Sequence, residues 1–255
     1  MAGVLGQIIE DKRRELGALR RMPLPPPPPR RAVQLARPPG EPVRLIAEIK
    51  RRSPSAGALS TVLGVADRAR AYERGGAAMI SVLCDAAHFD GAYEHMTLAR
   101  DATSLPILCK EFVIDECQLD LARAYGADAV LLIARCLAPA RLAALAAAAR
   151  ERELEVLAEV YAPEEVPVVL DAGATLVGVN TRDLDTLVMH ADQAQRILGE
   201  LPSSVTRVHL SGLRTEAHVR ALAGSRADAA LIGESLMRED EPSALLARLV
   251  AAASG

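Results

Sequence analysis

Residues 45–57, LIAEIKRRSPSAG, place two charged side chains at the end of an otherwise apolar strand. Alternate side chains of a strand share a face, so Glu48 and Lys50 point the same way as Ile46. Moving a carboxylate and an ammonium out of water is costly unless each finds a partner. We therefore expect this strand to end at a cleft in which opposite charges meet.

The pattern of this stretch recurs along the chain. Short runs rich in Val, Ile and Leu alternate with helical stretches rich in Ala, Arg and Glu. Several runs open on the same kind of cue, GGAAMIS, GADAVLL, GATLVGV and RADAALIG, which is typical of a helix C-cap that leads into a strand. The expected strands are 44–50, 78–83, 106–110, 129–134, 154–160, 175–180, 207–211 and 229–233. The expected helices lie near 62–74, 92–102, 115–125, 138–152, 163–171, 192–199, 215–223 and 241–252.

Eight alternations of strand and helix predict a fold of the α/β class. Strands that are apolar almost throughout are typical of a parallel sheet covered by helices. Eight is also the number of strands in a closed (β/α)8 TIM barrel, and we expect that fold with an extra N-terminal helix. The alternative is a doubly wound open sheet, which usually carries a Gly-rich dinucleotide fingerprint after its first strand, and the sequence has none there.

A helical stretch and a proline-rich stretch precede the first strand. Residues 3–21 carry apolar side chains at helical spacing. The following MPLPPPPPRR contains five consecutive prolines, which favour extended polyproline II. We expect an N-terminal helix at 1–22, a stiff linker at 23–42 and a single catalytic barrel domain at 43–255. The alternative for the proline run is a ligand for a partner protein.

Composition excludes several classes of function. The chain has 255 residues, with 30 basic and 33 acidic side chains and a net charge of −3, which gives no electrostatic case for binding nucleic acid or an anionic membrane. The four cysteines form no CxxC pair and the five histidines are scattered, so we expect reduced thiols and no metal site. Since no stretch approaches about 20 apolar residues and no signal-peptide core is present, we expect a cytoplasmic protein.

Polar side chains collect at the carboxyl ends of the expected strands, where barrels of this class carry their active sites. These ends hold Glu48, Lys50, Lys110, Glu159 and Asn180, while the interiors of the same runs are apolar. We expect the opposite charges to compensate each other in one cleft. Structural alternatives remain: a buried ion pair for the first two, a solvated strand end for Lys110, and a chain turn for Asn180.

Two glycine-containing loops predict a phosphate site. SGLRT (211–215) follows the seventh expected strand and IGESLM (232–237) follows the eighth. Loops at these two places often bind phosphate through backbone N–H groups. Gly212 and Gly233 permit a close approach of the backbone, and a short helix starting near Glu234 would add its N-terminal dipole. We expect a phosphorylated small-molecule substrate.

Several stretches resemble one known family. IAEIKRRSPSAG, PILCKEFVIDECQLDLARAYGADAVLLIA, LAEV, GVNTRDLDT, SGL and IGESLM are similar to indole-3-glycerol phosphate synthase, a (β/α)8 lyase of tryptophan biosynthesis with a helix before its first strand. The resemblance runs from the N-terminal helix to about Pro242. It implies ring closure of 1-(2-carboxyphenylamino)-1-deoxyribulose 5-phosphate with loss of carbon dioxide and water, without a cofactor or metal. We expect a monomer or a weak homo-oligomer.

The resemblance also implies roles for individual residues. Lys110 matches the general acid that protonates the ketone oxygen, and Glu159 matches the group that supports proton transfer in the dehydration. Lys50 matches a lysine near the substrate carboxylate, and Glu48 is its neighbour. The other matches are Asn180 and Arg182 for positioning, Phe89, Phe112, Leu131 and Leu184 around the aromatic ring, and Ser53, Ser211, Gly212, Gly233 and Ser235 on the phosphate side.

Two positions depart from the family pattern. The family usually has a glutamate directly before its SG motif, where this chain has Leu210, and a serine where this chain has Ala92. Three alternatives therefore stay open. One is a paralogue that acts on a substituted anthranilate derivative in a secondary pathway. Another is a different phosphate-binding barrel such as phosphoribosylanthranilate isomerase, whose cysteine and aspartate pair is not convincingly present. The third is a non-catalytic barrel that binds a phosphorylated ligand.

Overall fold

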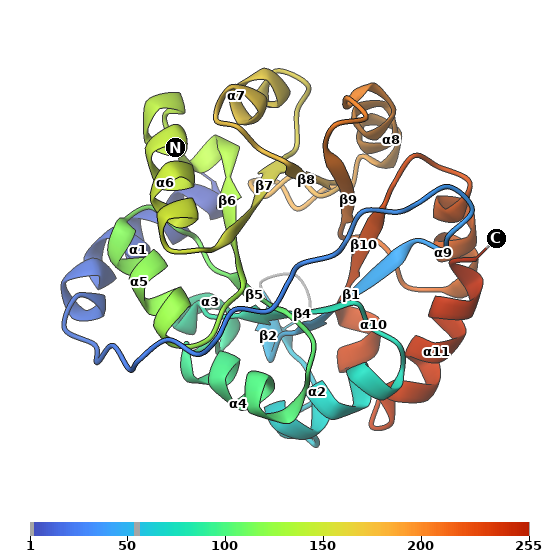
Figure 1. The fold of residues 1–255 in the computed structure, drawn as a ribbon, viewed down its shortest axis with the longest axis horizontal. Coiled ribbons are helices and arrows are strands. Elements are labelled where there is room, and N and C mark those ends of the chain that lie inside the picture. The colour runs from blue at the N-terminus through green and yellow to red at the C-terminus, as the bar shows by residue number, and fades with distance from the viewer. Residues whose placement is uncertain (1–2, 54–56, 255) are drawn as a thin grey trace.

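Eight parallel strands form a closed barrel, with helices around it (Figure 1). The computed structural model describes residues 3–53 and 57–254. The order of neighbouring strands is β1, β10, β9, β8, β7, β6, β5 and β4, so the predicted (β/α)8 barrel is confirmed. The barrel strands are β1 (Arg44–Ile49), β4 (Met79–Leu83), β5 (Ile107–Lys110), β6 (Ala129–Ile133), β7 (Glu155–Val160), β8 (Leu176–Asn180), β9 (Thr206–Leu210) and β10 (Ala229–Ile232).

The first strand closes the sheet because it pairs on both sides. On one side β1 pairs with β10, with Ala47 opposite Ile232, and on the other it pairs with β4, with Glu48 opposite Ser81. A closed sheet has no unpaired edge. Closure also brings the loop that follows the last strand next to the end of the first strand, although the sequence separates the two by most of the chain.

Alternation along the strands divides the core into two layers. One buried cluster holds Ile46, Met79, Leu108, Leu131, Leu157, Leu176, Val208 and Leu231, which face the barrel interior. Their strand neighbours join a second cluster between the barrel and the helices, which includes Ala47, Ile80, Val82, Val130 and Leu132. Because side chains fill the interior, the barrel is a packed core, and polar chemistry is confined to its ends.

The helices follow the expected alternation, and short elements are added at the loops. The main helices are α1 (Val4–Leu19), α2 (Val65–Arg74), α4 (Glu94–Ala102), α5 (Glu116–Ala124), α6 (Pro139–Glu151), α7 (Glu165–Asp171), α8 (Ala191–Glu200), α9 (Glu216–Ala223) and α11 (Pro242–Ala252). The short ones are α3 (Ala86–Phe89), η1 (Ala134–Cys136) and α10 (Glu234–Met237), and β2 (Arg52–Ser53) pairs antiparallel with β3 (Gly57–Ala58). Among the described residues, no helix has the length and apolar character that a membrane span requires.

The cue that opens several strands has the expected backbone conformation. Gly76 and Gly126 adopt φ of 88° and 96°, in the left-handed region that residues with a Cβ avoid. Each follows a helix and turns the chain into the next strand, so the glycine in these sequences serves the αβ turn.

The proline segment, residues 23–38, contains no helix or strand and runs across the amino end of the barrel, in front of the strands in Figure 1. Two aspartates bind it there. Asp128 accepts a hydrogen bond from the backbone N–H of Arg31 (2.7 Å), and Asp228 accepts one from that of Arg37 (3.2 Å). Each aspartate also accepts the backbone N–H at a neighbouring strand, at Ile107 and at Arg207. Further contacts, such as the hydrogen bond from Arg123 to the Pro28 carbonyl and the ion pair of Arg30 with Glu155, attach the segment along its length.

Helix α1 lies at the carboxyl end of the barrel, at the opposite end from the proline segment. Its buried residues Leu5, Ile8 and Ile9 extend the inner cluster. An ion pair of 2.9 Å between Arg20 and Asp115 joins the end of the helix to the start of α5. The N-terminal helix thus becomes part of the end that carries the polar strand termini.

We expect the stability of the fold to decrease in acid because His209 is buried in its neutral form. Burial lowers the pKa of His209 to about 4, and its Nδ1 has no partner in the described structure. The unfolded chain binds this proton near pH 6.5, whereas the folded chain binds it only near pH 4. The free energy of unfolding should therefore decrease as the pH falls from about 6.5 to 4, by about 3 kcal/mol in total. Urea unfolding at a series of pH values measures this dependence.

The variant His209→Gln should lose most of that decrease, because glutamine does not titrate in this range. The exposed His218→Gln on α9 is the matched control for replacing a histidine. If His209→Gln keeps the slope of the wild type, the acid sensitivity has another origin.

Candidate active site

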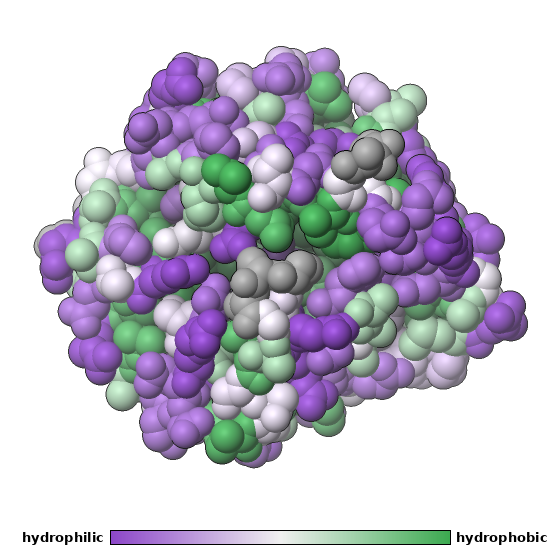
Figure 2. All heavy atoms as spheres, turned by 180° about the vertical axis from the view of Figure 1, so that it is seen from behind, coloured by the Kyte–Doolittle hydropathy of each residue, from purple (hydrophilic) through white to green (hydrophobic). Residues whose placement is uncertain are grey.

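A pocket opens at the carboxyl end of the barrel. Figure 2 shows this face, where hydrophobic side chains gather around a hollow near the centre and hydrophilic side chains surround them. The lining includes Glu48, Lys50, Ser53, Phe89, Lys110, Phe112, Leu131, Glu159, Asn180, Arg182, Leu184, Ser211, Gly212, Gly233 and Glu234, all of which were singled out from the sequence. Ser235 was singled out too but does not line the pocket, and its hydroxyl is buried without a partner in the described structure.

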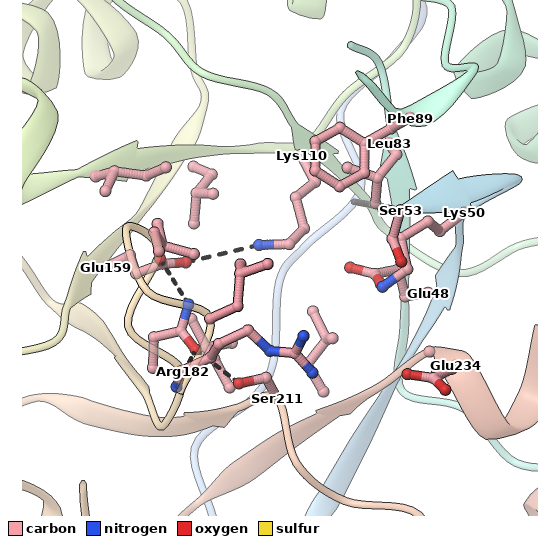
Figure 3. Close-up of a pocket in the computed structure, with 18 of the residues that line it drawn as sticks. Glu48, Lys50, Ser53, Leu83, Phe89, Lys110, Glu159, Arg182, Ser211 and Glu234 are labelled. Atoms are coloured by element: carbon pink, nitrogen blue, oxygen red, sulfur yellow. Dashed lines mark hydrogen bonds and ion pairs between the residues drawn. The ribbon is translucent and has the colours of Figure 1, made fainter. Parts of the chain in front are cut away.

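Three strand ends bring a lysine, a carboxylate and an amide together, and Figure 3 shows Lys110 pointing toward Glu159. Lys110 ends β5, Glu159 lies near the end of β7, and Asn180 ends β8. The Asn180 Nδ2 donates a hydrogen bond to Glu159 Oε1 (2.9 Å), and Lys110 Nζ lies 3.6 Å from Glu159 Oε2. That ion-pair distance exceeds a hydrogen bond. The ammonium thus keeps a counter-charge and still has N–H groups to offer to a substrate oxygen.

Asn180 also organises the two loops beside it. Its Oδ1 accepts hydrogen bonds from Ser211 Oγ (2.6 Å) and from the backbone N–H of Arg182 (3.0 Å). Ser211 has φ of 63°, a left-handed conformation that costs energy for a residue with a Cβ. Its hydroxyl also lies 3.0 Å from that of Thr181. These hydrogen bonds hold the strained turn in place at the rim of the pocket.

A second ion pair lies across the pocket. Lys50 Nζ is 2.6 Å from Glu48 Oε1, and the Glu48 side chain is 2% exposed. Each of these two charges is thus compensated by the other. Gly233, which follows β10, packs directly on this carboxylate: a Cβ at that position would lie 2.5 Å from Glu48 Oε1.

The two glycine loops form one side of the pocket. Gly212 has φ of 87°, and Gly233 precedes α10, whose first N–H groups have no partner within the helix. At the rim, Glu234 forms ion pairs with Arg214 (3.4 Å) and Arg238 (3.1 Å). This side of the pocket therefore offers backbone donors and lies near cationic side chains, which is the arrangement that a phosphate requires.

An apolar wall faces these polar groups. The rings of Phe89 and Phe112 lie with their centroids 6.0 Å apart. Leu131 and Leu184 complete the wall that the sequence predicted, and α1 adds Val4, Leu5 and Ile8. The pocket thus combines apolar side chains with charged groups, which suits an aromatic ring joined to a phosphorylated chain.

Leu210, at the end of β9, gives this pocket an apolar patch. It is buried and packs against Gly178, where an added Cβ would lie 2.6 Å from Leu210 Cδ1. Because Leu210 stands directly before the SG motif, this position supplies no carboxylate to the pocket. The carboxylate that pairs with Lys110 is that of Glu159.

Sequence reasoning missed a charged cluster next to the pocket. Lys12 of α1 forms ion pairs with Asp85, Glu111 and Glu15, and Glu111 lines the pocket. The scarcity of lysine in the sequence could have indicated this cluster. Lysine occurs only at positions 12, 50 and 110 among the 30 basic residues of the chain, and all three lie at this end of the barrel. Within the described residues, no group of three or more His, Cys, Asp or Glu side chains could hold a metal ion.

Comparisons with known proteins agree on one family. The family described as "Indole-3-glycerol phosphate synthase" matches residues 7–249. Similar proteins include "Indole-3-glycerol phosphate synthase 2" of Streptomyces coelicolor, 42% identical over 98% of this chain and 100% of its own length. "Indole-3-glycerol phosphate synthase" of Mycobacterium avium is 43% identical over 89% of this chain and 82% of its own length.

Solved structures share the fold at low sequence identity. The 3-hexulose-6-phosphate synthase of Salmonella typhimurium has a TM-score of 0.68 at 13% identity, covering 82% of this chain and 98% of its own. The thiamine phosphate pyrophosphorylase of Pyrococcus furiosus has a TM-score of 0.63 at 19% identity, covering 82% and 95%. At this identity the likeness concerns the barrel alone.

The packing of Gly233 on Glu48 leads to a prediction. Gly233→Ala should destabilise the fold by about 1–3 kcal/mol, because the new methyl group displaces a buried, ion-paired carboxylate. Gly199→Ala in α8 is the matched control, since a Cβ there meets no atom within 4 Å. The control should stabilise by about 0.5–1 kcal/mol. Equal unfolding midpoints in denaturant for the two variants would show that Glu48 is not held against this backbone.

Proposed function

Because the chain belongs to the indole-3-glycerol phosphate synthase family, we propose that its pocket closes the indole ring of 1-(2-carboxyphenylamino)-1-deoxyribulose 5-phosphate. The reaction releases carbon dioxide and water and gives indole-3-glycerol phosphate. The chain is accordingly a carbon–carbon lyase of tryptophan biosynthesis. The observation that carries this function is the Lys110–Glu159 pair between an apolar wall and a pair of glycine loops.

The substrate fits the pocket in one orientation. Its phosphate binds at the side formed by Gly212, Gly233 and α10. Ser53 and Ser211, which line the pocket, are further donors. Its aromatic ring takes the apolar wall of Phe89 and Phe112. The ketone of the ribulose chain then lies between the two ends, where Lys110 and Glu159 are found. The binding energy of both ends is thus used to orient the reacting carbons.

Lys110 acts as the general acid in ring closure. The ring carbon that carries the carboxylate attacks the ketone carbon, and the carbonyl oxygen takes the electron pair of the broken C=O π bond. A proton from the Lys110 ammonium neutralises this oxygen as its charge develops. Glu159 Oε2, 3.6 Å from Lys110 Nζ, supplies the counter-charge beside this ammonium.

The apolar wall favours the decarboxylation step. Loss of carbon dioxide returns the C–C bond electrons to the ring system and is favoured when the carboxylate leaves water for an apolar site. Lys50 lies on the charged side, near the carboxylate of the substrate, and its pairing with Glu48 fixes its position. The ion pair thus orients the substrate carboxylate without surrounding it by water.

Dehydration completes the aromatic indole. A proton leaves the ring system and the hydroxyl departs as water, so the step needs a base and an acid together. Glu159 accepts the proton and is oriented by the hydrogen bond from Asn180. Asn180 in turn holds Arg182 and Ser211 at the rim. No electron carrier is needed, because the atoms balance with carbon dioxide and water as the released products.

We also propose that the enzyme works in the cytoplasm as a monomer or a weak homo-oligomer. In this proposal residues 1–22 form an N-terminal helix, residues 23–42 a linker, and residues 43–255 a single catalytic barrel. Size-exclusion chromatography with light scattering tests the oligomeric state.

The variant Lys110→Met should lose turnover by about 100-fold or more, because methionine cannot donate the proton. Its Michaelis constant should stay within a few-fold of the wild type, since phosphate and ring are bound elsewhere. Purified protein, the carboxyphenylamino substrate and the fluorescence of the indole product provide the assay. Arg196→Met, an exposed cation on α8, is the control and should retain full turnover. Near-normal turnover by Lys110→Met would remove this residue from the acid role.

Leu210 favours an alternative form of this function, in which the natural substrate carries a substituent on its aromatic ring. An apolar substituent would gain contact with Leu210, whereas a glutamate there would have to be desolvated. If this is the natural substrate, kcat/KM for a methyl-substituted ring should exceed that for the unsubstituted ring by about 10-fold. Leu210→Glu should reverse the preference. If the wild type prefers the unsubstituted ring, the substituted substrate is excluded, and the reaction of tryptophan biosynthesis is the function that stands.

A further inference from the structure

Lysine is rare in this chain, and its use is selective. The chain has 30 basic residues, and every one outside positions 12, 50 and 110 is arginine. Arginine supplies the exposed cations that form ion pairs, such as Arg14 and Arg70, and also buried cations such as Arg68. Two of the three lysines belong to the proposed reaction. The third, Lys12, lies on α1 and is 2% exposed.

The ammonium of Lys12 is surrounded by three carboxylates. Its Nζ lies 2.7 Å from Glu15, 2.9 Å from Asp85 and 3.1 Å from Glu111. An ammonium has three N–H donors pointing in different directions, so it can serve three carboxylates, whereas a planar guanidinium suits paired acceptors. This geometry gives a physical reason for a lysine at this position in an arginine-rich chain.

One partner, Glu111, stands between two residues of the pocket. Lys110 precedes it as the proposed acid, and Phe112 follows it in the apolar wall. The Glu111 Oε1 accepts the backbone N–H of Phe112 (2.7 Å) and lies at the same time 3.1 Å from Lys12 Nζ. The ammonium therefore fixes the backbone that carries both the acid and the ring.

The other partner, Asp85, holds the second ring of the wall. It is the N-cap of α3, where its Oδ1 accepts the backbone N–H of His88 (2.7 Å), and its Oδ2 faces Lys12. Helix α3 ends at Phe89, whose ring lies 6.0 Å from that of Phe112. Both rings thus lie on segments that the same ammonium anchors, one through each carboxylate.

We propose that Lys12 is a positioning residue, whose buried ammonium locks α1 to the segments that carry Lys110, Phe89 and Phe112. This inference rests on the proposed function, since it assigns Lys12 to the same reaction. Lys12 is not among the residues that line the pocket. It acts through Glu111 and Asp85, and its loss would leave Lys110 intact but displaced.

Charges in the cluster make it sensitive to pH. Burial, with the nearby charge of Asp85, raises the pKa of Glu111 to about 7, although Lys12 opposes the rise. Burial would lower the pKa of Lys12, but the charges of Glu111 and Asp85 outweigh it and hold that pKa above its ordinary value. The groups that face the cluster are Glu15 from α1, Cys84 and Asp85 after β4, Cys109 of β5 and Tyr93 before α4. As the pH falls through about 7, Glu111 is protonated and its attraction for Lys12 weakens.

The test compares Lys12→Met with Arg14→Met, an exposed cation on the same helix. A displacement of about 1 Å at the reacting atoms can cost about 100-fold in rate, so kcat of Lys12→Met should fall at least 10-fold. The control should stay within 2-fold of the wild type. Circular dichroism and thermal unfolding establish that both variants are folded at the assay temperature. A folded Lys12→Met with the kcat of the control would overturn the inference.

A second variant covers the case in which Lys12→Met does not fold. Glu111→Gln keeps the side-chain shape and the acceptor for Phe112, but it neither titrates nor attracts the ammonium strongly. The kcat of the wild type should decline as the pH falls through about 7, and this inflection should vanish in Glu111→Gln. A purely structural role would leave the pH dependence unchanged, and superimposable pH profiles would sink the inference. Absence of turnover in the wild type would instead refute the proposed function itself.

Discussion

Pairing of β1 with β10 is the constraint on which the site depends. These strands begin and end the barrel in sequence, and their contact turns an open row of strands into a ring. Only a ring brings the end of the first strand to the loop after the last. Glu48 consequently lies against Gly233, so the ion pair with Lys50 borders the glycine loops of the proposed phosphate site. In an open sheet these groups would occupy opposite edges.

Charge compensation then explains how the mouth of the ring tolerates so many buried ions. Lys50 is paired with Glu48, Lys110 with Glu159, and Lys12 with several carboxylates. Removal of Lys50 or Lys110 would leave a buried carboxylate, Glu48 or Glu159, without its counter-charge, which costs several kcal/mol. The closest pair, between Lys50 and Glu48, is a direct contact, whereas Lys110 is held more loosely. The looser contact belongs to the group whose N–H is proposed to act on the substrate.

The two ends of the barrel serve different purposes. At the amino end, Asp128 and Asp228 accept backbone N–H groups from the proline segment and from neighbouring strands, and these hydrogen bonds serve stability. At the carboxyl end, Ser211 adopts a strained conformation, and charged groups are concentrated. The proline segment links these ends along the chain, since it passes beneath the barrel between α1 at the mouth and β1. Polyproline II stiffness suits this task, because a stiff segment loses little entropy when it is bound.

The sequence by itself determined the barrel and most of the lining of its pocket. The spacing of hydrophobic residues and the turn residues determine strands and helices locally, so these could be predicted. Parallel strands bring their carboxyl ends together, so polar strand ends such as Lys110 and Glu159 could be assigned to one cleft. Tertiary structure alone decided which charges pair and which residues from outside the strands join them. Lys12 lies on a helix far from Glu111 in sequence, and no periodicity encodes the path of the intervening proline segment. Contacts of this kind depend on how the elements dock, which is fixed by the packing of the whole chain.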